Sequence, residues 1–262
     1  MNNFFFILSL FFILIFQSSY TQEISELRAT YTDEKITLDG IDSELSWGKT
    51  QVINDDFYQI FPVPENKGSQ KNEIKIIYDD KFLYIFAKAS TKDGKASVTS
   101  LERDYQVPGT DAIFILLDTY SDSSNAFWFE ANSVGVKKDA LVSNGGLRFE
   151  SDIDFSWDIK YEVETFISEE FYNIEFKIPF GSLKFPEGST KWKIQLYRAD
   201  SANSEFSSWT KVPKGQNFSR LSFFGDLIFD KPLGSSKSPI IVIPYTNGIV
   251  SKDYENKSSF SD

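Results

Sequence analysis

The segment from Glu73 to Ala89, EIKIIYDDKFLYIFAKA, most constrains what this chain can fold into. In its first half, Ile74 and Ile76 alternate with charged residues, which predicts a strand with one buried and one solvated face, typical of antiparallel sheets. The second half is apolar on both faces, so we expect a strand that is covered on both sides. Asp79-Asp80-Lys81 joins the halves with residues that favour tight turns. The segment predicts a hairpin at the centre of a sandwich.

Further strands are expected along the chain, because short apolar or alternating runs recur between turn residues. They cover residues 111–118, 126–131, 156–164, 171–178, 192–197 and 223–229. Helical periodicity is almost absent apart from one turn over Asp42–Trp47, with Asp42 as its N-cap. We therefore predict an all-β fold, an antiparallel β-sandwich of jelly-roll type with about 8–10 strands. Trp47, Trp157 and Trp192 are expected in its core, whereas residues 22–31, 55–70, 90–108 and 135–154 are interpreted as a lead-in and loops.

The residues that are missing exclude several kinds of chemistry. The chain has 262 residues, none of them Cys or His, which excludes disulfides, thiol nucleophiles, Ser-His-Asp triads and imidazole zinc sites. Its net charge of -11, without clusters of Lys and Arg, argues against nucleic acid as a partner. Any catalysis would fall to carboxylates, Lys, Tyr or Ser.

The two ends of the chain differ in character from the middle. Phe4–Phe16 is an apolar run followed by small residues at Ser19 and Thr21, which predicts a signal peptide over residues 1–21. We therefore expect export to the periplasm, the outer membrane or the extracellular space. Residues 22–232 would form the sandwich. Residues 233–262 are interpreted as a linker followed by the apolar run Ile240–Tyr245, which lacks strand partners of its own. This run either adds a strand to the sandwich or is the truncated start of a second domain.

A series of short motifs resembles the family-9 carbohydrate-binding modules over Lys35–Phe229. These motifs are Leu38-Asp39-Gly40 with Asp42, Glu44 and Trp47; Tyr78-Asp79-Asp80-Lys81-Phe82-Leu83-Tyr84; Asp111 with its apolar strand; Glu175–Ile178 before Pro179-Phe180; and Phe224-Gly225. A second group is also similar, namely bacterial cell-surface proteins in which such a module precedes an outer-membrane β-barrel. The segments that resemble this group are Asp118-Thr119-Tyr120, Asn125-Ala126-Phe127, Asp154–Asp158, Pro179–Pro186 and Ile243-Pro244-Tyr245.

The resemblance implies a β-sandwich that binds sugar and carries structural calcium. In the family, two Trp residues clamp the sugar, one about three residues before the strand-opening Asp and one about six residues before the Phe of Phe-Gly. This chain has Pro108 and Phe218 at those places, so it departs from the pattern. Tyr105 and Phe218 are the nearest aromatic substitutes.

The candidate site residues are aromatic and polar side chains in connections between strands. Sugar binding needs a flat aromatic face for the ring and polar groups for the hydroxyls. The predicted carbohydrate-binding residues are Tyr105, Trp209, Phe218, Arg103, Asp104 and Arg220. Calcium prefers carboxylate and carbonyl oxygens, and the predicted ligands are Asp79, Asp80, Asp111 and Asp118. No EF-hand spacing occurs, and carboxylates in turns are commonly just solvated.

Three hypotheses for function follow. The first is a secreted or cell-surface carbohydrate-binding module without catalytic activity, which binds poly- or oligosaccharide in support of carbohydrate catabolism. The second is an assembly domain that has lost sugar binding and contacts an outer-membrane barrel or an enzyme. The third is a glycosidic-bond hydrolase, for which the resemblance offers only that such modules accompany O-glycosyl hydrolases.

Overall fold

The computed structural model describes residues 25–54, 57–92, 95–105 and 109–235. Within these ranges the chain forms fourteen strands and very little helix. The strands are β1 (Glu26–Tyr31), β2 (Val52–Ile53), β3 (Tyr58–Phe61), β4 (Asn72–Tyr78), β5 (Phe82–Ser90), β6 (Ala112–Asp118), β7 (Ala126–Asn132), β8 (Lys137–Val142), β9 (Ile153–Asp154), β10 (Glu162–Ile167), β11 (Phe171–Pro179), β12 (Lys191–Asp200), β13 (Glu205–Ser208) and β14 (Gly225–Phe229). The helical elements are α2 (Phe149–Asp152) and the 3-10 turns η2 (Asn144–Gly146), η3 (Phe180–Ser182) and η4 (Leu221–Phe223).

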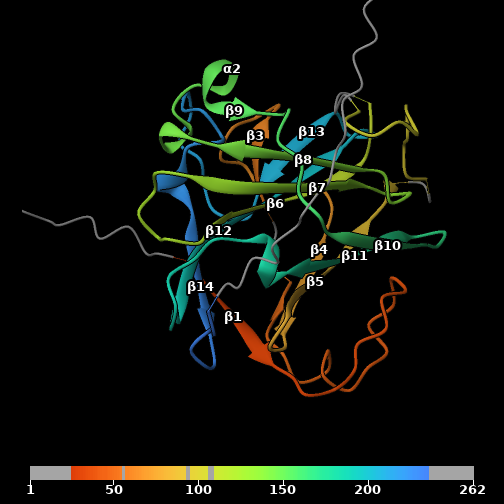
Figure 1. The fold of residues 1–262 in the computed structure, drawn as a ribbon. Helices are drawn as coiled ribbons and strands as arrows, with labels where there is room; N and C mark the ends of the chain where they lie inside the picture. Colours follow the sequence, from red (N-terminus) through yellow and green to blue (C-terminus); the bar gives the residue numbers. More distant parts are fainter. Residues whose placement is uncertain (1–24, 55–56, 93–94, 106–108, 236–262) are drawn as a thin grey trace, which may run out of the picture.

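The strands build two sheets that share one strand, which confirms the predicted β-sandwich (Figure 1). Sheet A runs in the order β14-β12-β6-β7-β8-β9; β13 also pairs with β12, and β3 pairs with β13. Sheet B runs in the order β10-β11-β5-β4, with β2 beside β4. β1 lies between them and pairs in parallel with both β14 and β4. The arrangement is therefore mixed rather than wholly antiparallel, and residues 26–31 are a strand rather than the expected lead-in.

The main core fills the space between the two sheets. It consists of every second side chain along each strand, the ones that point inward. Examples are Ile113, Ile115 and Leu117 of β6 and Ile174 and Phe176 of β11. Trp192 is fully buried there, as predicted, against Phe180, Phe185 and Phe229. The predicted central hairpin is also confirmed, because β4 and β5 pair throughout and Asp79 closes their turn by accepting the amides of Lys81 and Phe82.

The outer face of sheet B is covered by the segment that follows β1. Trp47 is fully buried there and packs on Phe86 at 5.8 Å between ring centroids, which confirms its role as a core plug. The helical turn expected over Asp42–Trp47 exists only as successive hydrogen bonds between residues three apart, beginning at Glu44. Asp42 does not cap it, because its carboxylate pairs with Lys75 instead.

Two expectations from periodicity are corrected by the tertiary structure. Residues 137–142 form β8, a strand that was predicted as part of a polar loop because Gly135 and Asn144-Gly145-Gly146 flank it. It contains Lys137, Lys138 and Asp139. These residues are tolerated because partners elsewhere in the chain satisfy them: Lys137 Nζ donates to the Tyr161 carbonyl, for example, and Asp139 accepts the Ile159 amide. Conversely, residues 156–161 alternate between buried and exposed but pair with no strand, because they cross from the edge of sheet A to the edge of sheet B.

Several expectations fall outside the described residues. These are the signal peptide over residues 1–21, the apolar run Ile240–Tyr245 and the clamp position Pro108. Within the part of the chain that is described, no helix has the length and apolarity needed to cross a membrane. The outer face of sheet A, in contrast to that of sheet B, is only partly covered, and this face carries the candidate site.

Candidate functional site

An aromatic pocket of about 540 Å³ opens on the outer face of sheet A. Its walls are mainly aromatic, and they come from β3, β6, β7, α2, β13 and the segment before η4. The aromatic residues that line it are Phe61, Phe114, Trp128, Phe149, Phe155, Phe206 and Phe218. Phe61 is 59% exposed and Phe149 is 41% exposed, so the rim of the pocket presents rings to solvent. Pockets of this size and character are typical of small-molecule sites.

The side-chain alternation of the strands places these rings on one face. Successive side chains of a strand point to opposite faces, so Phe114 points outward while Ile113 and Ile115 enter the core. Trp128 of β7 is outward for the same reason, and its neighbour Phe129 is in the core. The ring centroids of Phe114 and Trp128 are 5.7 Å apart, which forms the floor of the pocket.

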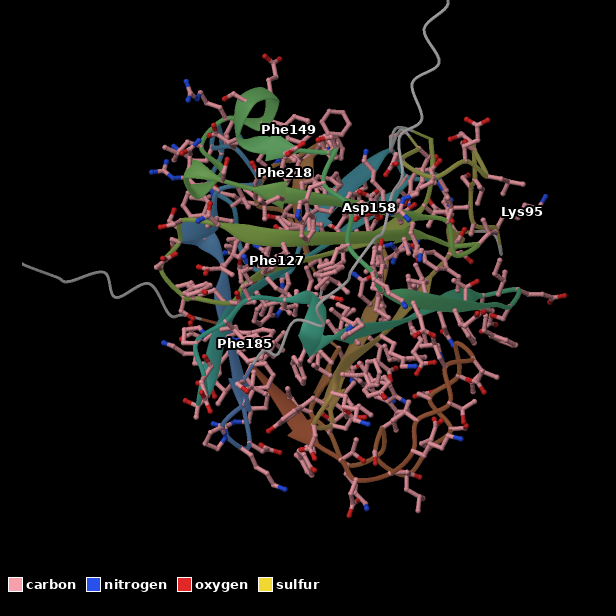
Figure 2. The ribbon with its side chains drawn as sticks, viewed as in Figure 1. Lys95, Phe127, Phe149, Asp158, Phe185 and Phe218 are labelled. Carbon is pink, nitrogen blue, oxygen red and sulfur yellow. The ribbon has the colours of Figure 1, made fainter. Side chains whose placement is uncertain are left out.

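Phe218 contacts aromatic rings on three sides of the pocket. Its centroid lies 5.1 Å from that of Phe206, 5.4 Å from that of Phe149 and 6.2 Å from that of Trp128. The hydroxyl of Tyr197 donates to its backbone carbonyl, which fixes the loop that carries it. Figure 2 shows Phe149 and Phe218 close together beside α2. Phe218 was predicted as a sugar-contacting residue, and the structure places it in the wall of the pocket.

Polar groups gather at the turn between β12 and β13. Asp200, Ser201, Ser204 and Glu205 line this end of the pocket. Asp200 accepts the backbone amide and the side-chain amide of Asn203, at 3.2 and 2.9 Å. Glu205 accepts from Gln59 Nε2 at 2.9 Å. Asp200 also pairs with Arg198 at 3.4 Å, and Glu205 also accepts the Ser69 amide. Both carboxylates are buried, so these contacts hold the polar end of the pocket in place.

A buried polar cluster lies beside Trp128 on the same face of sheet A. Glu130 is fully buried, which raises its pKa to about 7, and the ammonium of Lys138 opposes this increase. Oε2 of Glu130 accepts from Nε1 of Trp128 at 3.1 Å, which fixes the orientation of the indole. Lys138 lines the pocket, with its Nζ 4.5 Å from the centroid of Phe155 and 3.2 Å from the Tyr105 carbonyl oxygen.

The other predicted aromatic residues do not line the pocket. Tyr105 is 3% exposed and belongs to the same buried cluster as Phe114 and Trp128, where the burial of its hydroxyl raises its pKa and Glu130 adds to this increase. Trp209 is 7% exposed and packs in the core between the sheets. A Cβ built on Gly225 would lie 2.5 Å from Cζ3 of Trp209, so the glycine of the Phe-Gly motif is needed for this packing. The structure gives both rings packing roles.

The predicted charged residues are distributed over the surface. Arg103 pairs with the buried Asp139, with the exposed Asp158 and, at 3.8 Å, with Asp104, at the crossing from sheet A to sheet B. None of these residues lines the aromatic pocket. Arg220 lines a neighbouring hollow instead. The predicted set is therefore not one site, although Phe218 and Arg220 lie two positions apart in the same loop.

The four predicted calcium ligands do not form one site. Asp79 and Asp80 lie in the β4–β5 turn, whereas Asp111 and Asp118 lie at opposite ends of β6. Their carboxylates are already engaged: Asp111 accepts the amides of Ser97 and Ser201, and Asp118 accepts those of Tyr120 and Ser123. Among the described residues, no group of three or more acidic side chains is placed to hold a metal ion. These residues do not fit a shared calcium site.

The pocket also contains residues that sequence reasoning missed. Phe206 and Phe61 lie on β13 and β3, two strands that pair with each other. Residues 58–61 were expected in a loop, and residues 205–208 were in no predicted strand. Trp128 was predicted in a strand but not as a residue of the pocket. The available signal was its period-2 position, because the neighbours Phe127 and Phe129 face the main core and Trp128 therefore faces the opposite side of the sheet.

Solved structures of sugar-binding modules share this fold. A family-9 carbohydrate-binding module from Caldicellulosiruptor kristjanssonii in complex with cellotriose is 16% identical, with a TM-score of 0.55 over 84% of this chain and 100% of that chain. The same module in complex with glucose gives 15% identity and a TM-score of 0.56 over the same shares. A putative carbohydrate-binding protein from Bacteroides uniformis is 14% identical, with a TM-score of 0.63 over 79% of this chain and 100% of that chain.

At these identities the likeness concerns the fold. The described part of the chain has the fold of a family-9 carbohydrate-binding module, as its motifs predicted. No family model matches the sequence, and no curated protein matches it either.

Proposed function

We propose that this protein is a carbohydrate-binding module that holds a sugar in the aromatic pocket on sheet A. The pocket itself supports this most directly, because it combines exposed aromatic rings with polar residues at the β12–β13 turn. Aromatic faces bind the apolar side of a sugar ring, and carboxylates and hydroxyls bind its hydroxyl groups. The fold adds support, because two of the similar structures hold cellotriose and glucose.

In this proposal Phe218, Phe206 and Phe149 contact the sugar ring. Trp128 forms the floor, and the polar residues of the β12–β13 turn bind hydroxyl groups. The protein acts without catalysis, as an exported module that supports the breakdown of a polysaccharide by a separate enzyme. Phe218 replaces the Trp found in the family's clamp, so we expect a weaker or differently shaped stacking surface.

The test is electrophoresis of the purified protein through native gels cast with a panel of plant and algal polysaccharides. Retardation by at least one polymer is expected. Phe218→Ala should abolish it while lowering the free energy of unfolding by only about 1–2 kcal/mol, because the ring is partly exposed. Phe166→Ala is the matched control: it removes a 41% exposed ring on β10, in the other sheet, and should leave retardation unchanged.

Migration that no polymer retards would contradict this proposal. It would instead favour the second hypothesis, an assembly domain that contacts an outer-membrane barrel or an enzyme, which is consistent with the replacement of the clamp Trp by Phe218. Equal retardation of wild type and Phe218→Ala would place the binding surface elsewhere on the molecule.

A further inference from the structure

A second hollow, of about 420 Å³, lies beside the aromatic pocket and has a different lining. Three loops form it: the β6–β7 turn, the η2 segment and the segment that leads into η4. Hydroxyl and amide side chains face it, together with one arginine. They are Ser123, Ser124, Asn125, Asn144, Arg220 and Ser222. This polar hollow therefore offers hydrogen-bond donors and a positive charge, where the aromatic pocket offers ring faces.

Arg220 differs from every other arginine of the chain. Of the five arginines, Arg28, Arg103, Arg148 and Arg198 each form an ion pair with a carboxylate. Within the described ranges, Arg220 pairs with no carboxylate; its Nη1 donates to the neutral Oε1 of Gln216 at 2.8 Å. Its guanidinium lies 5.6 Å from the centroid of Phe223, which restricts its orientation. A planar, pre-oriented guanidinium without a counter-charge is suited to bidentate binding of a carboxylate or a similar oxyanion.

The polar hollow and the aromatic pocket are lined by neighbouring residues of the same two loops. Phe218 lines the aromatic pocket, and Arg220, two residues later, lines the polar hollow. In the neighbouring loop, Leu147 lines the polar hollow and Phe149 lines the aromatic pocket. Two residues of extended chain span about 7 Å, so one oligosaccharide can reach both places.

The two loops are also locked together. The Ser219 hydroxyl donates to the Gly146 carbonyl at 3.0 Å, and a Cβ on Gly146 would lie only 2.1 Å from the Ser219 carbonyl oxygen. Gly146 also has a φ of +63°, a region that glycine adopts more readily than other residues. The spacing between Phe218 and Arg220 on one side and Leu147 and Phe149 on the other is therefore fixed.

We propose that the polar hollow is an anion subsite, in which Arg220 binds a carboxylate or sulfate ester of a saccharide whose neighbouring ring stacks in the aromatic pocket. This inference rests on the proposed function and specifies its substrate class as acidic saccharides. Asn125, Asn144 and the serine hydroxyls supply further hydrogen bonds to the anion or to adjacent hydroxyl groups.

The experiment is isothermal titration calorimetry with two pairs of probes. One pair is a uronic-acid oligomer and its methyl ester, and the other is a sulfated galactan oligomer and its desulfated form. We expect one acidic member to bind about tenfold or more tightly than its neutral counterpart, the usual size of a charge-assisted hydrogen-bonded contact. The pair that shows the difference distinguishes carboxylate from sulfate. The preference should weaken as salt is added.

Arg220→Gln should abolish the preference for the acidic member and leave binding of the neutral member unchanged. Arg148→Gln is the matched control, because Arg148 is 75% exposed and does not line the hollow, and it should retain the preference. Equal affinity for acidic and neutral members, or a preference that survives in Arg220→Gln, would overturn the inference while leaving the proposed function intact. Absence of binding by saccharides of either kind, in these titrations and in the gels, would overturn both.

Discussion

The carboxylate of Glu175 accepts a hydrogen bond from the backbone amide of Gly40, with 3.0 Å between Oε2 and N and 135 positions between the residues. The same oxygen accepts the Asp39 amide at 3.0 Å, and Asn173 Nδ2 donates to the Gly40 carbonyl. A Cβ on Gly40 would lie 2.7 Å from the Thr165 carbonyl carbon. The Leu-Asp-Gly motif thus has a structural role: it anchors the covering segment to sheet B.

This anchor predicts a specific pH dependence of stability. Burial raises the pKa of Glu175 to about 7, from an ordinary value of 4.5. The folded protein therefore binds this proton more tightly than the unfolded chain does, so the free energy of unfolding falls as pH rises from about 4.5 to about 7. Glu175→Gln should reduce this decrease in the free energy of unfolding by up to about 3 kcal/mol. Urea denaturation at several pH values measures it.

The control for the pH prediction is Glu164→Gln. Glu164 is exposed on β10 and lies directly opposite Glu175 in the ladder. It should reproduce the pH dependence of the wild type. Glu130, whose pKa burial also raises to about 7, contributes in the same direction, so Glu175→Gln should remove only part of the slope. An unchanged slope in Glu175→Gln would contradict the assignment.

Arg198 is expected to be essential for joining the two sheets. Its guanidinium, 2% exposed, donates to Asn72 Oδ1 at 2.9 Å and to the Ser90 carbonyl in sheet B, and pairs with Asp200 at 3.4 Å. Arg198→Met should lower the free energy of unfolding by about 3–5 kcal/mol, because it leaves buried acceptors and a carboxylate without their partner. Chemical denaturation measures this loss. Arg148→Met removes a guanidinium that is 75% exposed, and Asp152 keeps its hydrogen bonds to the Arg148 amide and to Ser151, so this change should alter stability by no more than about 1 kcal/mol.

The contact between Trp209 and Gly225 can be tested with a double-mutant cycle. Gly225→Ala forces a methyl group into the indole and should cost about 1–3 kcal/mol of stability. In Trp209→Phe the smaller ring relieves the contact with the indole, although the Ser25 carbonyl oxygen at 2.6 Å still opposes the methyl group. The double variant should therefore recover part of the loss and be more stable than the sum of the single changes predicts. Strict additivity would show that the two residues do not interact. Trp209→Phe should also leave polysaccharide retardation unchanged, unlike Phe218→Ala.

Trp157 and Trp192, both expected in the core, should respond differently to truncation. Trp192 is fully buried, so Trp192→Ala should cost about 3–5 kcal/mol. Trp157 lies in the crossing segment, is only partly buried and packs on Phe127 at 5.4 Å, so Trp157→Ala should cost about 1–2 kcal/mol. Thermal and urea unfolding of both variants provide the comparison. Equal losses would indicate that Trp157 is as buried as Trp192.

The sequence by itself determined which segments are strands and which of their faces are buried, wherever the pattern was apolar. β4, β5, β6, β7, β11 and β12 follow directly from such runs, and Trp47 and Trp192 were correctly placed in the interior. This works because alternation is a local property, set by the pleat of a single strand. Phe218 could be named from the motif spacing because the Phe-Gly motif and its loop lie close in sequence.

The tertiary structure alone decided which strands are neighbours and which surfaces remain open. β1 pairs in parallel with two strands of distant sequence, and β8 buries Lys138 and Asp139 because partners elsewhere in the chain satisfy them. The aromatic pocket likewise needs Phe61, Trp128 and Phe206 brought together from three parts of the chain. A local pattern specifies how much of a strand is buried but not against what, since pairing and charge compensation depend on contacts between residues far apart in sequence.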